Sequence, residues 1–369
     1  MNSHKHKKVS IFLPSLGGGG AEKVMVVLAN SFVQRGVSVD LVLAKANGPY
    51  LQNVHKNVKV VNLHSSRQIN SLIPLIKYIR LNNPPVMLSA LTSANLILIF
   101  ARLLSRTSFR LVISERAVSS VALDDNKLLR LKIVPFLVRL FYPLADLIIA
   151  VANGVAKDLI KNYGISPQKI KVIYNPVVSQ DLISLSKENV DHKWFRNRNV
   201  PVILAVGRLT SQKNFTLLIN AFSKVISRID ARLVILGDGE LKDDLEALVN
   251  KLHISHKVEF PGFVKNPYAW LRNSSLFVLS SNYEGLPGTL IQAMACGVPV
   301  VSTDCPSGPS EILENGRWGR LVPTEDLSAL VTAIIDTLQD KKKPDVEFRA
   351  KFFSIRNGTN AYLEALELI

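Results

Sequence analysis

The strongest constraint on the fold is a regular alternation of short apolar runs with longer helical patterns, which occurs twice along the 369 residues. In the first half, a β-branched run at 9–13 precedes four glycines and a helical pattern at 21–34, and similar pairs follow. Strands that alternate with helices of this length pair in parallel and form a doubly wound sheet. A second series begins at 202. The sequence therefore predicts an α/β protein with two parallel-sheet domains.

The sequence also predicts where one domain ends and the next begins. A polar, weakly patterned stretch at about 177–199 has the composition of a linker, and it separates a domain at 1–178 from one at 199–343. A last helix is expected at about 345–367, and we expect residues 344–369 to pack across onto the N-terminal domain. Further strands are expected at 37–43, 58–62, 87–91, 110–114, 147–151 and 171–174, and then at 202–206, 232–236, 258–260, 276–279, 298–302 and 319–322.

The charge of the chain is unevenly distributed. The net formal charge is +16, but residues 1–200 carry +17 and residues 201–369 carry −1. Such an excess suits nucleic acid, an anionic membrane surface or a phosphorylated substrate, or it is a solvated basic face without a partner. The basic half has no recognisable nucleic-acid reading motif, so we do not expect nucleic-acid binding.

The first candidate site is the glycine run Gly17–Gly20 between a strand and a helix. Glycine lets the backbone approach a ligand closely, and the N–H groups of the following helix attract an anion. The run is not a dinucleotide fingerprint unless Asp40 supplies the ribose-binding acid. A tight turn without a ligand is the alternative.

The second candidate site follows the first strand of the second domain. Arg208 and Lys213 lie there at the carboxyl end of a parallel strand, where open α/β sheets bind ligands. An arginine binds a diphosphate through two parallel hydrogen bonds, and a lysine adds a compact charge. The alternative is a pair of solvated basic side chains.

The third candidate site is the most specific. Glu284 follows a buried strand, and Pro287 suits the first turn of a helix that runs to about 295. One face of this helix presents Thr289 and Gln292 together. A carboxylate beside an anion-binding helix start suits a sugar attached to a phosphate. The backbone N–H groups expected to be free at this helix start are those of Gly288, Thr289 and Leu290.

These three sites together resemble the retaining GT-B glycosyltransferases of glycosyltransferase family four, over essentially the whole chain. The family hallmark is a glutamate, seven residues and a second glutamate, preceded by an arginine and a lysine. Here they are Arg208, Lys213 and Glu284, with Gln292 in place of the second glutamate. The resemblance implies two Rossmann-like domains with the donor in an inter-domain cleft.

The resemblance also implies roles for individual residues. Arg208 and Lys213 would hold the donor diphosphate, Glu284 would bind hydroxyls of the donor sugar, and Gln292 would face the ribose. Many members carry a histidine near the reacting sugar where this chain has Arg116, and a buried Glu115–Arg116 ion pair is the alternative there. Donor-binding roles also fall on Gly18, Gly19, Gly20, Gly285, Leu286, Gly288 and Thr289, and acceptor-side roles on Glu115 and Arg116.

The expected activity is transfer of a sugar from a nucleotide-sugar donor, a UDP-HexNAc or a UDP-hexose, to a lipid-linked saccharide. The nearest likeness is to bacterial transferases that extend polyprenyl-diphosphate-linked glycans. We expect no cofactor. We also expect no metal, because the chain has no Asp-x-Asp pair of the type that binds a divalent ion. The alternatives are a UDP-sugar epimerase, a nicotinamide-dependent dehydrogenase and a non-catalytic membrane-binding relative.

A lipid-linked acceptor would place the enzyme peripherally on the inner, cytoplasmic face of the cell membrane. The basic N-terminal half suits such a surface, since each lysine or arginine near anionic lipid contributes about 1 kcal/mol. Two segments with basic residues among apolar ones could dock there, at 69–81 and 127–142. The alternative for each is a core helix whose basic side chains reach solvent.

Overall fold

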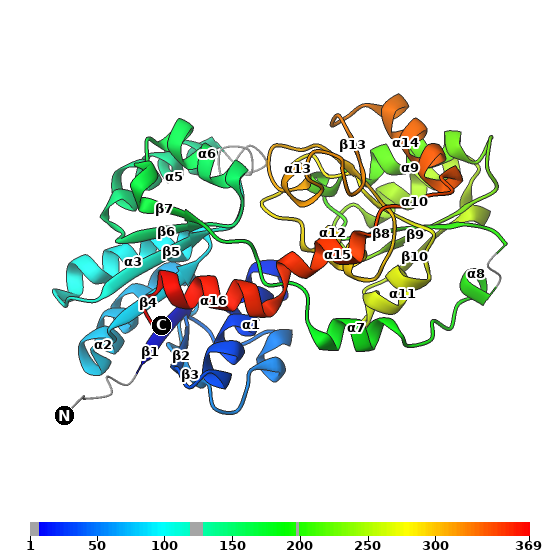
Figure 1. The fold of residues 1–369 in the computed structure, drawn as a ribbon. Helices are drawn as coiled ribbons and strands as arrows, with labels where there is room; N and C mark the ends of the chain where they lie inside the picture. The colour runs from blue at the N-terminus through cyan, green and yellow to red at the C-terminus, as the bar shows by residue number, and fades with distance from the viewer. Residues whose placement is uncertain (1–6, 119–127, 197–198) are drawn as a thin grey trace. The chain divides into compact units, whose positions relative to one another are not determined.

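The structure is a computed structural model that describes residues 7–118, 128–196 and 199–369. The chain divides into two compact units. Unit 1 is Met1–Pro176 with Ile355–Ile369, and unit 2 is Val177–Ser354. Each unit is built on one parallel sheet, so the predicted α/β fold with two doubly wound sheets is confirmed (Figure 1).

The sheet of unit 1 has seven strands in the order β3-β2-β1-β4-β5-β6-β7. Its central strands are buried on both faces, which explains why they are continuous apolar runs rather than alternating ones. The strands are β1 (Lys8–Leu13), β2 (Ser38–Leu43), β3 (Lys59–Asn62), β4 (Val86–Ala90), β5 (Arg110–Glu115), β6 (Leu147–Ala150) and β7 (Ile170–Val172).

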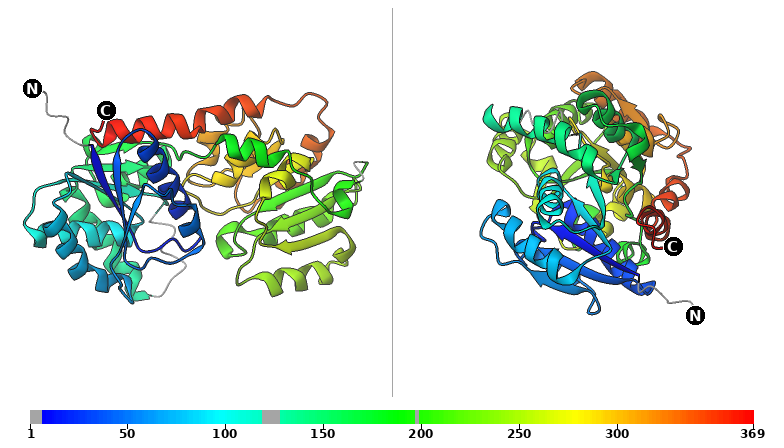
Figure 2. Two further views of the ribbon diagram at one scale, coloured as in Figure 1. Left: turned by 90° about the horizontal axis from the view of Figure 1, so that it is seen from below. Right: turned by 90° about the vertical axis from the view of Figure 1, so that its left-hand side faces the viewer.

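Helices cover both faces of this sheet. Val9, Ile11 and Leu13 of β1 share a hydrophobic core with α1 and the C-terminal helix α16. The remaining large helices follow one another over the other face (Figures 1 and 2). The helices of unit 1 are α1 (Gly20–Gln34), α2 (Leu72–Asn82), α3 (Thr92–Ser105), α5 (Leu128–Phe141), α6 (Asn153–Tyr163) and α16 (Ile355–Ala365).

Unit 2 repeats the plan with six strands in the order β10-β9-β8-β11-β12-β13. Its strands are β8 (Val202–Val206), β9 (Arg232–Leu236), β10 (Val258–Gly262), β11 (Leu276–Leu279), β12 (Val300–Thr303) and β13 (Arg320–Val322). Its helices are α7 (Gln180–Ser186), α8 (Lys193–Arg196), α9 (Phe215–Val225), α10 (Lys242–Lys251), α11 (Pro267–Asn273), α12 (Gly288–Ala295), α13 (Pro309–Ile312), α14 (Leu327–Gln339) and α15 (Val346–Ala350).

Two expectations about the connecting segments are wrong. The stretch at 177–199 is part of unit 2 and contains α7, whose N-cap Ser179 accepts a hydrogen bond from the Leu182 N–H. The last helix is broken into α15, a 3-10 turn and α16, with an extended residue at Ser354. The break occurs where the N–H groups of Val177 and Val178 donate to the carbonyl of Phe353 at 2.9 and 3.0 Å.

The C-terminal helix α16 packs within unit 1. Tyr362 is fully buried in the core that α16 shares with α1, and the Arg110 guanidinium donates to the Ala365 carbonyl at 3.1 Å. The helix also lies tightly against the end of the segment that leaves unit 1. A Cβ on Gly358 would lie 2.9 Å from the Cβ of Pro176, so only glycine fits there without a shift.

Candidate donor and acceptor sites

Lys213 and Glu284 form an ion pair at the carboxyl end of the second sheet. Lys213 ends the 3-10 turn Ser211–Lys213 after β8, and Glu284 lies in the loop after β11. β8 and β11 are neighbouring parallel strands, so the loops that follow them meet at the same edge. The structure thus joins two residues that lie 71 positions apart in the sequence.

Glycines allow the Lys213 loop to pack closely. A Cβ on Gly207 would lie 3.2–3.3 Å from three carbons of the Lys213 side chain, which therefore passes directly over this residue. Gly237, at the end of β9, has a φ of +137°, and a Cβ there would overlap the carbonyl oxygen of Gly207. Gly237 requires glycine because of both this overlap and its backbone conformation, whereas a side chain at position 207 would press against the Lys213 side chain.

The ion pair is largely shielded from solvent. The side chains of Lys213 and Glu284 are 15% and 9% exposed. The Ser281 hydroxyl donates to Glu284 Oε1 at 2.7 Å, and the Ser280 hydroxyl donates to the Lys213 carbonyl at 2.8 Å. In such surroundings a carboxylate that loses its cation is left with an uncompensated charge, so the two side chains depend on each other.

The start of α12 lies in the same loop and presents free backbone donors. The N–H groups of Gly288 and Thr289 have no hydrogen-bond partner in the described part of the chain, and the Thr289 hydroxyl is buried without one. The Leu290 N–H, expected to be free, donates to the carbonyl of Pro287 at 3.2 Å. Pro287 is the N-cap residue rather than the first helical residue, so its carbonyl is available to the N–H group three residues later. The helix start therefore offers two N–H groups to an anion, not three.

A second layer of residues, which the sequence did not point to, supports this loop. The Thr303 hydroxyl donates to the Ser281 carbonyl at 2.6 Å, and the Ser307 hydroxyl donates to the Gly285 carbonyl at 2.8 Å. Gly308 has a φ of +97°, and a Cβ there would overlap the ring of Pro287. The sequence feature that could have indicated this support is the run Cys305–Pro309, which is rich in small and turn-forming residues and follows a strand.

The other expected donor-site residues of unit 2 lie around this loop. Arg208 is exposed, and its guanidinium has no hydrogen bond or ion pair in the residues that the structure describes. Leu286 is buried at 6% exposure and supports the loop from inside. Gln292 is half-buried on α12, one turn beyond Thr289.

The glycine run of unit 1 begins α1 as expected, with Gly19 as its N-cap and Gly18 at a φ of +101°. A Cβ on Gly19 would overlap Glu22 Oε2, so the Glu22 carboxylate folds back over the helix start. An acidic side chain at this position interacts favourably with the helix dipole. The start of α1 thus already has a neighbouring carboxylate.

Asp40 does not lie where the ribose-binding acid of a dehydrogenase would lie, at the carboxyl end of the strand. It lies in the third position of β2 and is buried, away from the carboxyl end of the strand. Its Oδ2 accepts a hydrogen bond from the Tyr78 hydroxyl at 2.6 Å and pairs with Lys8 Nζ at 2.9 Å. Burial, followed by the hydrogen bond to Asp40, raises the pKa of Tyr78 far above its usual value. Asp40 is therefore part of a core network.

Glu115 ends β5 and is buried. Its carboxylate accepts hydrogen bonds from the Tyr142 hydroxyl at 2.6 Å and from the Thr92 hydroxyl at 3.1 Å. Burial, followed by the charge of Glu115, raises the pKa of Tyr142 well above its ordinary value. Tyr142 consequently remains a phenol and donates its proton to Glu115 at any physiological pH.

Arg116 makes contacts that differ from the ion pair considered as an alternative. Its guanidinium donates to the Ser114 hydroxyl at 3.2 Å, the Tyr362 hydroxyl at 3.3 Å and Asn175 Oδ1 at 2.6 Å. Its backbone N–H, rather than its side chain, donates to Glu115 Oε1 at 3.2 Å. Arg116 therefore joins β5 to both segments at which the chain leaves and re-enters unit 1.

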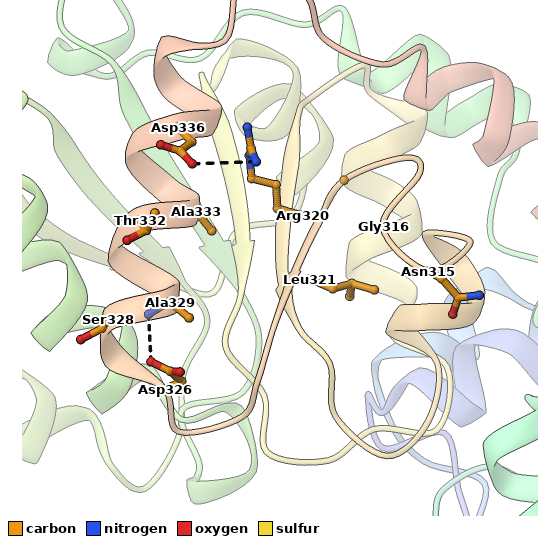
Figure 3. Close-up of a pocket in the computed structure, with 11 residues that line it drawn as sticks. Asn315, Gly316, Arg320, Leu321, Asp326, Ser328, Ala329, Thr332, Ala333 and Asp336 are labelled. Carbon is orange, nitrogen blue, oxygen red and sulfur yellow. Dashed lines mark hydrogen bonds and ion pairs between the residues drawn. The ribbon is translucent and has the colours of Figure 1, made fainter.

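A separate pocket of about 600 Å³ lies between β13 and α14 and contains none of the expected residues (Figure 3). Its charged groups are already used within the fold. Arg320 pairs with Asp336 at 3.9 Å, and Asp326 Oδ1 accepts a hydrogen bond from the Ala329 N–H at 2.8 Å. This pocket is not part of the candidate site.

The first prediction concerns the dependence of Lys213 and Glu284 on each other. Glu284→Ala should destabilise unit 2 by about 3 kcal/mol, because it leaves a shielded ammonium without its carboxylate. The double variant Lys213→Met/Glu284→Leu should recover most of that loss. All three tryptophans of the chain lie in unit 2, so tryptophan fluorescence during urea unfolding reports this unit. Strictly additive effects of the single variants would contradict the coupling.

The second prediction concerns Arg116. Arg116→Met removes three hydrogen bonds of a charged donor, each worth about 1.5–3 kcal/mol, and should accelerate amide exchange of α16 about tenfold or more. Arg139→Met, on the exposed side of α5 in the same unit, is the matched control and should leave α16 unchanged. The measurement is hydrogen exchange followed by mass spectrometry. Equal exchange of α16 in wild type and in Arg116→Met would show that Arg116 does not hold the helix.

Comparisons with known proteins show the family of the chain. The family model described as Glycosyltransferase Family 4 matches residues 18–180, and the model described as Glycosyl transferases group 1 matches residues 186–352. A Campylobacter jejuni protein is 32% identical over 94% of this chain and 96% of its own length. It is named an N-acetylgalactosamine-N,N'-diacetylbacillosaminyl-diphospho-undecaprenol 4-alpha-N-acetylgalactosaminyltransferase. A second C. jejuni relative, an alpha-1,4-N-acetyl-D-galactosaminyltransferase, is 28% identical over 90% of this chain and 89% of its own.

Solved structures share the fold. Anabaena HepE in complex with UDP and glucose superimposes with a TM-score of 0.79 at 20% identity, covering 99% of this chain and 100% of its own. The lipopolysaccharide outer core galactosyltransferase WaaB has a TM-score of 0.75 at 21% identity, covering 98% of this chain and 99% of its own. The dehydrogenase alternative is wrong. The chain belongs to glycosyltransferase family four and is a glycosyltransferase of the GT-B fold, of the kind that acts in polysaccharide and lipid-linked glycan biosynthesis.

Proposed function

We propose that the enzyme transfers a sugar with retention of configuration from a UDP-sugar, a UDP-HexNAc or UDP-hexose, to a lipid-linked saccharide. The observation that carries this proposal is the Lys213–Glu284 pair beside the two free N–H groups at the start of α12. A carboxylate suits the hydroxyls of a sugar, and the ammonium and the helix start suit its diphosphate. The names of the two C. jejuni relatives support an N-acetylhexosamine donor and an acceptor linked to undecaprenyl diphosphate.

The geometry suggests how Lys213 serves both partners at once. An ammonium carries three N–H donors, and Glu284 takes one of them. The other two remain for oxygens of the donor diphosphate. Lys213 would then hold Glu284 and the diphosphate in a fixed relation, so that the sugar bound by Glu284 and its leaving group are positioned together.

Charge develops on the UDP leaving group as the glycosidic bond breaks. In our proposal, Lys213, Arg208 and the N–H groups of Gly288 and Thr289 stabilise this charge without a metal ion. Arg208 is exposed in the structure, as expected for a side chain that closes on the ligand. The Gln292 amide would accept a ribose hydroxyl hydrogen without adding a negative charge near the diphosphate. The glycines of α1 and the Glu115–Arg116 segment are proposed to face the donor and acceptor from unit 1.

The acceptor determines where the enzyme works. A polyprenyl-linked saccharide carries its diphosphate at the membrane surface, and nucleotide-sugars are cytoplasmic. We therefore place the enzyme peripherally on the inner face of the cell membrane, with no nucleic-acid partner. The net charge of +17 in residues 1–200 supports an anionic surface as its neighbour. Of the two segments expected to dock there, 69–81 lies in α2 and the turn before it, and 127–142 contains α5, with Lys127 outside the described residues. In the described part of the chain, no helix has the length and apolarity to cross a membrane.

The third prediction tests the phosphate assignment. Arg208→Ala should weaken UDP binding by about 2 kcal/mol, or roughly thirtyfold, because one charged hydrogen-bonding group is lost. Uridine, which has no phosphate, should bind both proteins equally. Arg228→Ala, an exposed arginine after α9, is the matched control. The measurement is calorimetric titration in excess chelator.

Two results would contradict this assignment. One is UDP affinity that is unchanged in Arg208→Ala, and the other is an equal loss for UDP and uridine. A requirement for a divalent ion in UDP binding would contradict metal independence alone. Release of UDP from a UDP-HexNAc without any acceptor would favour an epimerase over a transferase.

A further inference from the structure

The two loops that carry Lys213 and Glu284 are joined by more than the ion pair. Four hydrogen bonds connect residues 211–214, after β8, to residues 282–283, after β11. All four involve Gln212, Asn214 or Asn282, which lie beside the lysine or just before the glutamate. We call these three residues and their four hydrogen bonds the amide clamp.

Asn282 lies at the centre of the amide clamp. Its backbone N–H donates to the Gln212 carbonyl at 2.9 Å, and its Nδ2 donates to the Ser211 carbonyl at 3.3 Å. Its Oδ1 accepts a hydrogen bond from Asn214 Nδ2 at 2.8 Å. Gln212 Nε2 donates to the Tyr283 carbonyl at 2.9 Å. The residues directly before and after the lysine are therefore both fixed to the loop that carries the glutamate.

Position 214 makes three demands on its side chain. The backbone there is left-handed, with φ +45° and ψ +48°, which asparagine, aspartate and glycine tolerate better than other residues. Asn214 is also the N-cap of α9, and its Oδ1 accepts a hydrogen bond from the Leu217 N–H at 3.1 Å. The third demand is the donor to Asn282. Glycine would supply only the turn and aspartate the turn and the cap, whereas asparagine supplies all three.

The hydrogen bonds of the two asparagines have a single direction. The series begins at the Leu217 N–H, which can only donate, and ends at the Ser211 carbonyl, which can only accept. Between them, each amide accepts through its oxygen and donates through its nitrogen. A half-turn of either amide would set two donors or two acceptors against each other. The amide clamp is therefore a directed link rather than an adaptable polar contact.

This link bears on the position of the lysine ammonium. Lysine has a flexible four-carbon stem, so the place of its charge depends on how firmly its backbone and stem are held. The amide clamp holds the backbone on both sides of Lys213, and the stem passes over Gly207. A small misplacement of a group that must meet a ligand is expensive, even when its cause lies outside the ligand contacts.

We propose that Gln212, Asn214 and Asn282 are positioning residues, which hold Lys213 and Glu284 in the relation that the donor diphosphate and sugar require. They act through the ion pair rather than as catalytic residues. The proposal rests on the proposed function, since it takes Lys213 as a ligand of the donor diphosphate.

The fourth prediction concerns two variants at position 214. Asn214→Gly adopts the turn, and Asn214→Asp adopts the turn and caps α9, so both should unfold in urea close to wild type. At neutral pH neither can donate to Asn282, and both should lose about tenfold in affinity for UDP but none for uridine. The neutral glycine variant separates the lost hydrogen bond from the charge of the aspartate. The measurements are calorimetric titration and tryptophan fluorescence.

A double-mutant cycle isolates the bond between the two asparagines. Asn282→Ala should also weaken UDP binding, and Asn214→Gly should add little in that background, because the shared bond is already lost. Asp326→Gly is the matched control. It removes the N-cap side chain of α14, elsewhere in unit 2, and should bind UDP like wild type.

A second measurement needs no ligand. Urea unfolding of Lys213→Met, Glu284→Leu and the double variant gives the coupling between these two residues. Expressed as a ratio of unfolding equilibrium constants, this coupling should fall about tenfold when the same cycle is repeated in Asn214→Gly. An unchanged coupling would overturn the proposal.

The UDP titrations separate this proposal from the proposed function. If Lys213→Met weakens UDP binding but Asn214→Gly and Asn282→Ala do not, the amide clamp has no positioning role. Equal losses for UDP and uridine in the two clamp variants would also overturn it. Wild-type UDP affinity in Lys213→Met would instead overturn the diphosphate role of Lys213. A weakened coupling in Asn214→Gly would then still show that the amide clamp positions the ion pair.

Discussion

The ion pair between Lys213 and Glu284 is the interaction on which the site of unit 2 depends. It forms because β8 and β11 are adjacent and parallel, so that the loops leaving their carboxyl ends share one edge. Glycine at 207 and 237 lets the lysine loop pack closely enough for the pair to form. Glu284 in turn fixes the loop that leads to α12 and thereby the position of the free N–H groups there. The order of the strands in the sheet thus brings a carboxylate, a cation and a helix start together in one small region.

Much of the fold could be predicted because the determinants are local. The strands β8, β9 and β11 are short β-branched or leucine-rich runs between turn residues, and their bounds match the expected ranges. The break before α16 could not be predicted, because its cause is a hydrogen bond from residues 177 and 178 to Phe353, far away in sequence. α7 was missed because its local signal is weak. Its short polar sequence has little helical periodicity, and its Ser179 cap was the only clear indication of a helix.

The candidate site shows the same division. Glu284, Lys213 and the start of α12 have a spacing that can be recognised in the sequence. The supporting hydroxyls of Ser281, Thr303 and Ser307 could not be recognised, because their role arises only when three loops meet. Arg116 is a further case: its sequence neighbour suggested an ion pair, but two of the three partners of its side chain, Tyr362 and Asn175, lie far away in the sequence.

The account divides the work of the protein between its two units. Unit 2 has the features of a donor site, and the net positive charge, which suits an anionic surface, lies in residues 1–200. Arg116 and the close contact of Gly358 with Pro176 hold together the segments by which the chain leaves and re-enters unit 1. The segments that connect the units are therefore fixed at their unit 1 ends by specific contacts.

The most direct test of the central claim is a crystal structure of the full chain with UDP bound. The account predicts that oxygens of the diphosphate accept hydrogen bonds from the N–H groups of Gly288 and Thr289 and from Lys213. It also predicts that Lys213 keeps its contact with Glu284. UDP bound away from the start of α12, with Lys213 and Glu284 uninvolved, would contradict the account.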